Sequence, residues 1–239
     1  MAEIAEMKLA AAESAAALVE NGMIVGLGSG STATLAVAAI GRRVAQGLRI
    51  TGVPTSEKTA AQARSLDIPL STLEEHDRID LTIDGADEVE RGSLDLIKGR
   101  GGALLREKIV ASATDRLIII VDERKMVDHL GSGRDPLPVE VVPFGWQAAA
   151  RRLEALGAEW TRRTGTGDAP FVTDGGHYIL DCIFPPYPSP LDLQRSLDQL
   201  VGIVEHGLFL GMTSEVIVGK DDRIERYSST RSSAGTGRP

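Results

Sequence analysis

Four charged side chains follow two apolar segments of the sequence, at points where strands are expected to end. Asp84 comes directly after the first segment and Asp87 lies beyond a Gly-Ala turn, whereas Lys98 ends the second segment and Glu107 follows on a predicted helix. Paired carboxylates can divide acid and base roles between them, and an ammonium group can stabilise an oxyanion that develops during a reaction. These residue types in this order predict proton-transfer chemistry.

Each of these groups also has a simpler interpretation. The acidic turn that holds Asp84 and Asp87 could be solvated or could bind a divalent cation, although the pattern of an EF-hand loop is absent. Glu107 on its own would be an ordinary helix-surface glutamate near the positive end of the helix dipole. The catalytic interpretation therefore depends on whether the fold brings these groups together.

A glycine-rich loop, Gly26–Thr32, lies between an apolar segment and a predicted helix. Backbone N–H groups of such a loop can surround an anion and the helix N-terminus adds positive potential, so the loop is a candidate phosphate site. We expect Ser31 or Thr32 to cap the helix, and a tight turn with a good cap is the alternative interpretation. A dinucleotide fingerprint is disfavoured because the next predicted strand ends in Pro54 without an acidic residue, and a Walker loop is excluded because Gly-Lys-Ser/Thr is absent.

The first half of the chain alternates predicted strands with predicted helices. Apolar periodicity and turn residues predict strands at 23–28, 48–53, 79–83, 94–97 and 117–121, and helices at 4–20, 32–46, 56–65 and 103–113. This alternation is typical of a doubly wound, Rossmann-like α/β fold with a mostly parallel sheet. Because ligands bind at the carboxyl ends of the strands in such sheets, we expect Asp84 and Lys98 at one sheet edge.

The pattern changes near Leu130, where a loop containing Gly, Ser and Pro marks a candidate domain boundary. Strand 139–142, helix 146–156, strands 159–163 and 178–183, helix 191–200 and strand 202–204 then follow the βαββαβ order of a ferredoxin-like α+β unit. Strands 215–218 and 224–227 are expected to return to the first sheet, which makes this unit an insertion. We therefore expect a Rossmann-like catalytic domain at 1–130 and 205–227, a ferredoxin-like domain at 131–204, and a disordered tail at 228–239.

Composition excludes several kinds of partner. A net charge of −8 at pH 7 disfavours nucleic acid and anionic membrane surfaces, and no apolar run reaches membrane-spanning length. Cys182 is the only cysteine, which rules out an intrachain disulfide and favours a cytoplasmic protein. The four histidines show no ligand spacing, so we expect no metal and no cofactor.

The glycine loop, the carboxylate pair, the lysine and the glutamate together make a set that aldose–ketose isomerisation needs. In that reaction a base moves a proton between two carbons through an enediolate, a cation stabilises the oxyanion, and another acid–base pair opens the sugar ring. Triosephosphate isomerase is a precedent for a glutamate base in a closed site. The sequence therefore predicts a sugar-phosphate isomerase that needs no cofactor.

Four motifs resemble those of A-type ribose-5-phosphate isomerase, in the same order along the chain. They are Gly28–Thr32, Asp84–Glu88, the stretch Lys98–Lys108 with its Gly-Arg-Gly-Gly loop, and Pro136–Val141. The resemblance covers nearly the whole chain, and four spaced motifs make it specific. It implies an enzyme of the non-oxidative pentose phosphate pathway that interconverts ribose 5-phosphate and ribulose 5-phosphate, as a homodimer or homotetramer.

The resemblance also implies roles for individual residues. Glu107 matches the general base, Asp84 the carboxylate for ring opening, Asp87 its supporting partner, and Lys98 the lysine that faces the sugar oxygens. The expected substrate-binding residues are Gly28, Ser29, Gly30, Ser31, Thr32, Gly99, Gly101, Lys8 and Lys125. Arg100 is a departure, because many members have a fourth glycine there, and we expect it to alter the mouth of the site.

Two functions of other classes stay open at this point. A non-catalytic sugar-phosphate effector-binding domain would come with an appended DNA-binding helix-turn-helix, and would gain nothing from holding Glu107 beside a carboxylate pair. A CoA-transferase-like enzyme would use a glutamate as its nucleophile, and mixing it with acyl-CoA would reveal a thioester intermediate.

Overall fold

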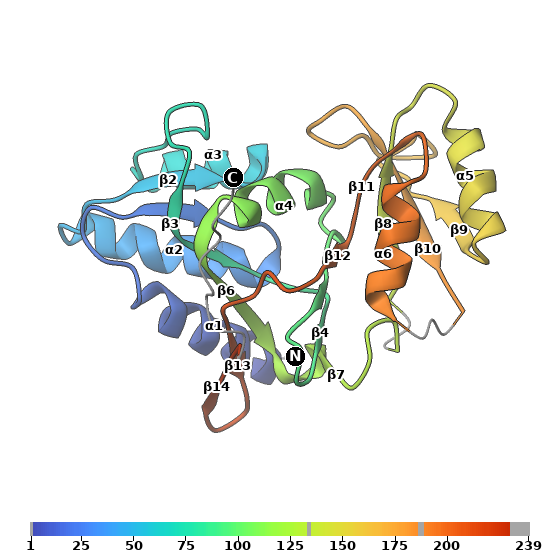
Figure 1. Ribbon diagram of the computed structural model, residues 1–239. Coiled ribbons are helices and arrows are strands. Elements are labelled where there is room, and N and C mark those ends of the chain that lie inside the picture. Colours follow the sequence, from blue (N-terminus) through green and yellow to red (C-terminus); the bar gives the residue numbers. More distant parts are fainter. Residues whose placement is uncertain (1, 133–134, 186–188, 230–239) are drawn as a thin grey trace, which may run out of the picture.

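A six-stranded sheet dominates the computed structural model, which describes residues 2–132, 135–185 and 189–229 (Figure 1). Its strands are β1 (Ile24–Leu27), β2 (Thr51–Pro54), β3 (Ile79–Asp84), β6 (Thr114–Asp122), β13 (Glu215–Gly219) and β14 (Ile224–Ser228). They are ordered β14-β13-β6-β3-β1-β2, and all neighbours are parallel except β13 and β14. The prediction of a mostly parallel α/β sheet, to which two late strands return, is confirmed.

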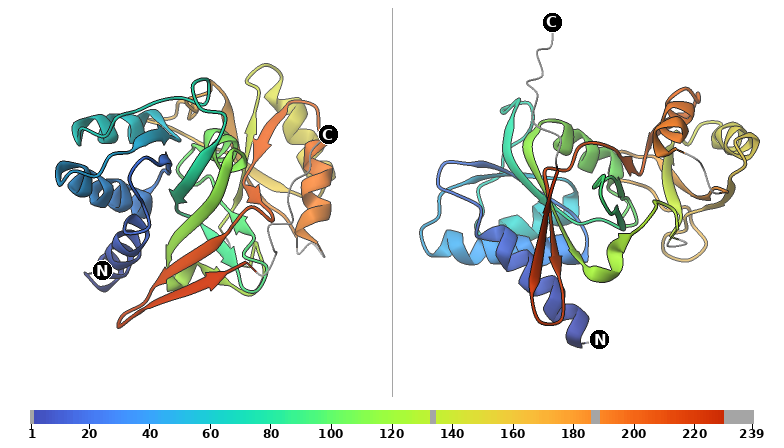
Figure 2. Two further views of the ribbon diagram at one scale, coloured as in Figure 1. Left: turned by 60° about the vertical axis from the view of Figure 1, so that its left-hand side comes forward. Right: turned by 60° about the horizontal axis from the view of Figure 1, so that its bottom comes forward.

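Helices cover both faces of this sheet (Figures 1 and 2). Along β6, Ile118 and Ile120 belong to the apolar cluster that includes α1 (Ala2–Ala16) and α2 (Ser31–Ala45). The alternate residues of β6 belong to a second cluster that includes Ala111 of α4 (Leu104–Ser112). Since successive strand residues point to opposite faces, the apolar run of β6 serves both layers. The remaining helix, α3 (Glu57–Ser65), packs beside β2 at the sheet edge.

The second sheet is antiparallel and lies to one side of the first (Figure 1). Its strands β8 (Leu137–Val141), β9 (Glu159–Arg162), β10 (Tyr178–Ile183) and β11 (Ile203–His206) are ordered β11-β8-β10-β9. Helices α5 (Trp146–Ala155) and α6 (Pro190–Asp198) share its apolar cluster. This strand order in a βαββαβ chain is the expected ferredoxin-like arrangement.

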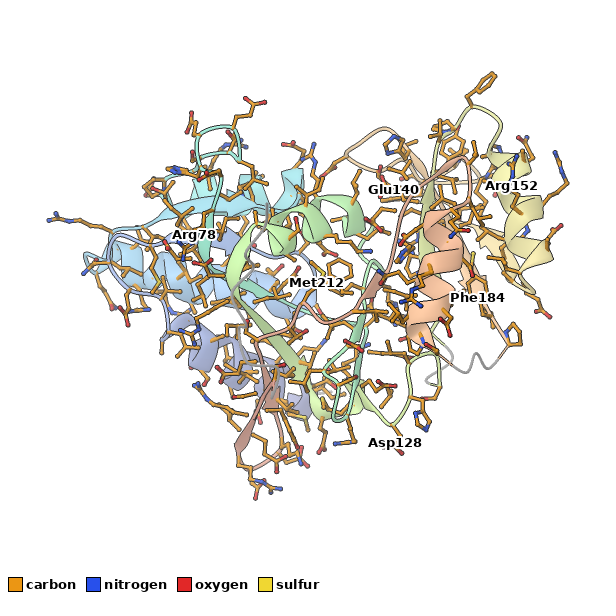
Figure 3. All side chains as sticks on the ribbon, in the orientation of Figure 1. Arg78, Asp128, Glu140, Arg152, Phe184 and Met212 are labelled. Carbon is orange, nitrogen blue, oxygen red and sulfur yellow. The ribbon has the colours of Figure 1, made fainter. Side chains whose placement is uncertain are left out.

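The two faces of β8 have different partners. Val139 and Val141 belong to the cluster under α5 and α6. Between them, Glu140 lies on the side of β8 that faces α4 (Figure 3). Its Oε1 accepts hydrogen bonds from Thr173 Oγ1 at 2.8 Å and from His177 Nδ1 at 2.9 Å. Through Glu140, the second sheet therefore presents a polar surface to α4, the helix that contains Glu107.

A third, small sheet connects the two larger ones. Its strands β12 (Leu208–Phe209), β5 (Leu96–Ile97), β4 (Glu88–Glu90) and β7 (Met126–Val127) each have two or three residues. The sequence analysis missed β4, β7 and β12, because strands this short carry no periodic pattern. The prediction of a strand from Leu94 was wrong, because Leu94 lies in a turn with φ of 61° and only Leu96–Ile97 pair.

Two predicted boundaries also need correction. The first helix ends at Ala16 and not Glu20, because Leu18 and Val19 donate to carbonyls three residues back, which makes a tighter turn. Ser228 belongs to β14, so the expected tail does not begin there, and residues 230–239 lie outside the described part of the chain. Within the described residues, the helices lack the length and apolar character that crossing a membrane requires.

Candidate active site

A cavity of about 450 Å³ lies where the N-terminal ends of α2 and α4 meet the carboxyl ends of β1 and β3. Loops after strands form its walls, as expected for an open α/β sheet. Of the predicted site residues, the cavity is lined by Lys8, Ser29, Gly30, Ser31, Thr32, Asp87, Lys98, Gly99, Gly101, Glu107 and Lys125. The fold thus brings together residues from five distant stretches of the sequence.

Glu107 is buried, which contradicts the interpretation as a surface glutamate. It lies in the first turn of α4 and is 4% exposed. Its Oε2 lies 3.4 Å from the ammonium nitrogen of Lys98, and no described residue donates a hydrogen bond to that oxygen. Burial, together with the carboxylates of Asp84 and Asp87, raises the pKa of Glu107 to about 8. A carboxylate oxygen with this pKa and no hydrogen-bond donor is suited to take a proton from carbon.

Lys98 extends from the end of β5 toward the carboxylates of Asp84 and Glu107. Its ammonium nitrogen lies 3.0 Å from Asp84 Oδ2 and donates to the carbonyl oxygen of Gly85 at 2.6 Å. Burial disfavours the charged form, but Asp84 and Glu107 more than offset this and raise the pKa of Lys98. Lys98 is therefore a fixed, permanently protonated cation at the cavity wall.

Asp84 is buried behind Lys98. Its Oδ1 accepts N–H bonds from Gly85 at 2.7 Å and from Ser29 at 3.1 Å, while Oδ2 contacts Lys98. Burial raises the pKa of Asp84, whereas Lys98 and the two backbone donors act in the opposite direction. Gly28 allows this close approach, because a Cβ at that position would lie 2.3 Å from Asp84 Oδ1. Gly28 and Asp84 thus lie behind the cavity wall and support it without lining the cavity.

Asp87 lines the cavity next to the loop formed by residues 99–102. Its Oδ2 accepts the backbone N–H of Arg100 at 2.9 Å. Gly99 has a φ of +105° and Gly102 a φ of +79°, conformations that favour glycine, and the Gly102 N–H donates to Gly99 O at 3.0 Å. The loop is therefore a tight turn held against Asp87.

The N-terminus of α2 forms the other end of the cavity. The prediction that Ser31 or Thr32 caps this helix was wrong: the cap position is Gly30, with a φ of +98° and no side-chain cap hydrogen bond. A side-chain cap would occupy N–H donors of the first turn, which an anion needs. Lys8, from α1, donates to Ser31 Oγ at 3.0 Å and adds a positive charge beside these donors. This end of the cavity has the composition of an anion site.

The Ser29 hydroxyl belongs to a cluster of buried and half-buried hydroxyl groups. Its Oγ lies 2.8 Å from Thr55 Oγ1, 2.8 Å from Ser56 Oγ and 3.1 Å from Thr59 Oγ1. Ser56 and Thr59 also form the cap of α3, and Thr59 Oγ1 donates to Gly28 O at 3.1 Å. Ser29 lines the cavity, and its hydroxyl network also holds the 26–32 loop in place.

Three basic side chains surround the mouth of the cavity. Arg100 and Lys125 both contact Asp135, with nitrogen–oxygen distances of 3.3 and 3.7 Å. Arg124 also lines the cavity, and its Nε donates to the buried Asp122 at 2.8 Å. The sequence analysis missed Arg124, although its position just after the apolar strand that ends at Val121 could have indicated it. Each of the three is paired with a carboxylate, so the mouth carries charges of both signs.

Elsewhere in the described parts of the chain, no group of three or more His, Cys, Asp and Glu side chains is arranged to hold a metal ion. Cys182 is buried in the second sheet, and burial raises the pKa of its thiol to about 12. It is therefore unsuited to act as a nucleophile.

Residues 51–223 match the family model of ribose 5-phosphate isomerase A (phosphoriboisomerase A). The chain belongs to this family. The ribose-5-phosphate isomerase A of Gloeobacter violaceus is 60% identical over 219 residues, which cover 92% of this chain and 94% of the relative. That of Thermomicrobium roseum is 54% identical over 226 residues, with 95% of each chain covered. The family prediction made from four motifs is confirmed.

Solved structures of the family have the same fold. A D-ribose-5-phosphate isomerase in complex with phospho-erythronic acid is 39% identical and has a TM-score of 0.90, with 94% of this chain and 99% of that chain covered. Ribose 5-phosphate isomerase A from Methanocaldococcus jannaschii is 37% identical with a TM-score of 0.89, and the match covers 93% and 98% of the two chains. The family fold therefore extends over nearly the whole chain.

Proposed function

We propose that this chain is an enzyme that interconverts D-ribose 5-phosphate and D-ribulose 5-phosphate. The observation that carries the proposal is the buried Glu107 carboxylate, whose Oε2 lies 3.4 Å from the Lys98 ammonium in a cavity that also has an anion site. A base, a fixed cation and a phosphate site are what isomerisation of a sugar phosphate requires. The names of the relatives support the same reaction.

The phosphate group is assigned to the end of the cavity formed by Gly30, Ser31 and Thr32. The first N–H groups of α2 and the ammonium group of Lys8 would bind its oxygens, and Lys125 also lines the cavity. This places the sugar carbons toward Lys98 and Glu107.

Ring opening needs one proton to leave O1 of the furanose and another to reach the ring oxygen. Asp87 lines the cavity and is assigned both transfers: it takes the O1 proton and gives it to the ring oxygen as the bond between C1 and that oxygen breaks, while Lys98 stays protonated and donates a hydrogen bond to the ring oxygen. Asp84 acts from behind Lys98, at 3.0 Å, and stabilises the ammonium form between turnovers. Of the carboxylate pair expected from the sequence, Asp87 would thus act on the sugar directly and Asp84 through Lys98.

Isomerisation then moves one proton between two carbons. Glu107 takes the C2 proton of the open-chain aldose, the C2–H electron pair forms the C1–C2 double bond, and charge develops on O1. Lys98 stabilises this enediolate, and a proton passes from O2 to O1. Glu107 returns its proton to C1, which leaves a carbonyl group at C2. One carbon is oxidised and its neighbour reduced, so no external oxidant is needed.

The ligand of a solved relative supports an enediolate intermediate. Phospho-erythronic acid has one carbon fewer than ribose 5-phosphate, and its planar carboxylate resembles the two oxygens of an enediolate. Compounds that resemble an intermediate bind tightly to enzymes that form it. The alternative functions are not favoured, because neither an effector-binding role nor acyl transfer calls for this combination of groups.

We further propose that the chain acts in the cytoplasm as a homodimer or homotetramer. Phe144 is 96% exposed and Val201 76%, and their segments are adjacent, because Val142 donates to Gly202 O at 3.0 Å. An exposed apolar patch of this kind favours self-association. Light scattering at micromolar concentrations would test it, and a monomer would contradict it.

A coupled assay with ribose 5-phosphate tests the function. We expect turnover that needs no nicotinamide and persists in EDTA, because Lys98 supplies the positive charge that the enediolate requires. Loss of activity in EDTA, restored by a divalent cation, would instead assign Asp84 and Asp87 as metal ligands. A thioester formed on incubation with acyl-CoA would indicate the transferase function.

A further inference from the structure

The loop that joins Lys98 to α4 is held by a residue from the second sheet. Arg163, directly after β9, donates from Nη1 to the carbonyl oxygens of Gly99 and Arg100, each at 3.0 Å. Asp181 on β10 accepts from the same guanidinium, with Oδ2 at 2.9 Å from Nε and Oδ1 bonded to Nη2. Because a guanidinium is planar with donors in fixed directions, this geometry ties two loop carbonyls to β10.

Phe171 supports the far end of the same loop. A Cβ on Gly102 would lie 2.5 Å from Phe171 Cζ, so the ring rests directly on the loop backbone. The guanidinium carbon of Arg163 lies 5.8 Å from the centre of this ring, and Phe171 N–H donates to Arg163 O at 2.9 Å. Arg163 and Phe171 therefore form one support on the outer side of the loop.

The inner side of the loop is the cavity wall. There Asp87 accepts the N–H of Arg100, the same residue whose carbonyl oxygen Arg163 binds. The peptide groups flanking Arg100 are thus held from both sides. Lys98 lies immediately before this fixed segment, and the helix that carries Glu107 begins just after it.

We propose that Arg163, anchored by Asp181, is a positioning residue for the isomerisation. It fixes the 99–102 loop and thereby the placement of Lys98 relative to Glu107. The second sheet would then contribute to catalysis as well as to the proposed association of subunits. This inference rests on the proposed function, because its readout is the isomerase reaction.

Four variants test the proposal by steady-state kinetics. Arg163→Lys keeps the charge, but a single ammonium group cannot bind Asp181 and two carbonyls in the geometry of the guanidinium. Arg163→Ala removes the charged group altogether, and Asp181→Asn weakens the anchor of Arg163. Arg162→Lys is the matched control, since the Arg162 guanidinium packs over Trp146 at 4.9 Å and over Tyr178 at 5.8 Å, away from the loop. A displacement of roughly 1 Å can cost up to about a hundredfold in rate. We expect kcat to fall about tenfold or more in both Arg163 variants, less in Asp181→Asn, and hardly at all in Arg162→Lys.

The pH profile of kcat/KM provides a readout that a purely structural role would not change. Glu107 faces Lys98, Asp84 and Asp87, and a loosened loop would admit water to this group. The half-maximal pH should therefore move lower in the Arg163 variants and stay unchanged in Arg162→Lys.

Thermal melting distinguishes misplacement from unfolding. If Arg163→Ala does not fold, Arg163→Lys and Asp181→Asn decide the outcome. A folded Arg163→Lys with the kcat and pH profile of the wild type would overturn the inference, and so would an equal loss in Arg162→Lys. If the wild type itself did not convert ribose 5-phosphate, the proposed function would fail instead.

Discussion

Lys98 Nζ lies 3.4 Å from Glu107 Oε2, and both side chains are 4% exposed. With Asp84 also buried, this small volume holds one ammonium and two carboxyl groups. If both carboxyl groups were ionised the group would carry a net negative charge away from water, which is costly. The raised pKa of Glu107 follows from this imbalance, and so does its capacity to hold a proton that it has taken from substrate.

Glu107→Gln tests the base directly. Glutamine keeps the size of the side chain but cannot accept the C2 proton, so kcat should fall about 10²–10⁴-fold while KM stays within a few-fold. The matched control is Glu159→Gln, the same change at an exposed position on β9. Kinetics and thermal melting of both variants check the prediction. A well-folded Glu107→Gln enzyme with near-normal turnover would remove Glu107 from the mechanism.

Lys98→Met should reduce stability as well as activity. It leaves Asp84 and Glu107 buried without a cation, and breaking a buried ion pair in this way costs about 3–5 kcal/mol in the free energy of unfolding. The double variant Lys98→Met/Asp84→Asn should regain part of this loss, because asparagine still accepts the N–H groups of Ser29 and Gly85. Urea unfolding measures the stability of both variants. The control is Lys58→Met, a change at an exposed position of α3. Equal stability of the single and double variants would show that the charge of Asp84 does not destabilise the protein when Lys98 is absent.

The fold could be predicted in outline from the sequence, because it is determined by long segments in which apolar residues recur with a regular period. Strand 178–183 was placed at its observed bounds, Tyr178–Ile183, since a clear apolar run there is flanked by turn residues. The small sheet was not predictable in the same way. Strands such as Leu208–Phe209 are held by pairing with distant segments and by the burial of Phe209, and local sequence carries little of that information.

The candidate site was predictable where the chemistry of a residue type is distinctive. Glu107 and Lys98 were identified from type and order, and the structure brings them together. Arg163 gave no such signal, because it lies far along the chain and its role depends on contacts with Gly99 O and Arg100 O. The hydroxyl network of Ser29 gave no signal either, because its partners come from the next loop and helix, and sequence spacing does not reveal such contacts.

Two serines of the glycine loop should behave differently when changed to alanine. Ser31→Ala removes the partner of Lys8 at the anion site, so KM should rise about tenfold or more with kcat little changed, since a hydrogen bond to a charged group contributes about 1.5–3 kcal/mol. Ser29→Ala removes the hydroxyl that lies within hydrogen-bond distance of Thr55, Ser56 and Thr59, and should lower the melting temperature more than it raises KM. Kinetics and calorimetry on both variants check this. The reverse pattern would mean that Ser29 binds the phosphate and Ser31 is structural.

The pH dependence of the reaction should reflect Glu107. Its pKa is raised from 4.5 to about 8, so at pH 6.5 most of the free enzyme carries a protonated Glu107 that cannot accept the C2 proton. As pH rises through about 8 the carboxylate form becomes dominant, and kcat/KM should increase up to tenfold per pH unit before it levels off. Lys98 stays protonated over this range, because its pKa is raised, so no loss is expected on the alkaline side near neutrality. Measurement between pH 6.5 and 9.5 avoids the second ionisation of the substrate phosphate, near pH 6. A profile that is flat from pH 6.5 upward would mean that Glu107 is already ionised in the free enzyme, and that Lys98 compensates its charge more completely than the burial of the site suggests.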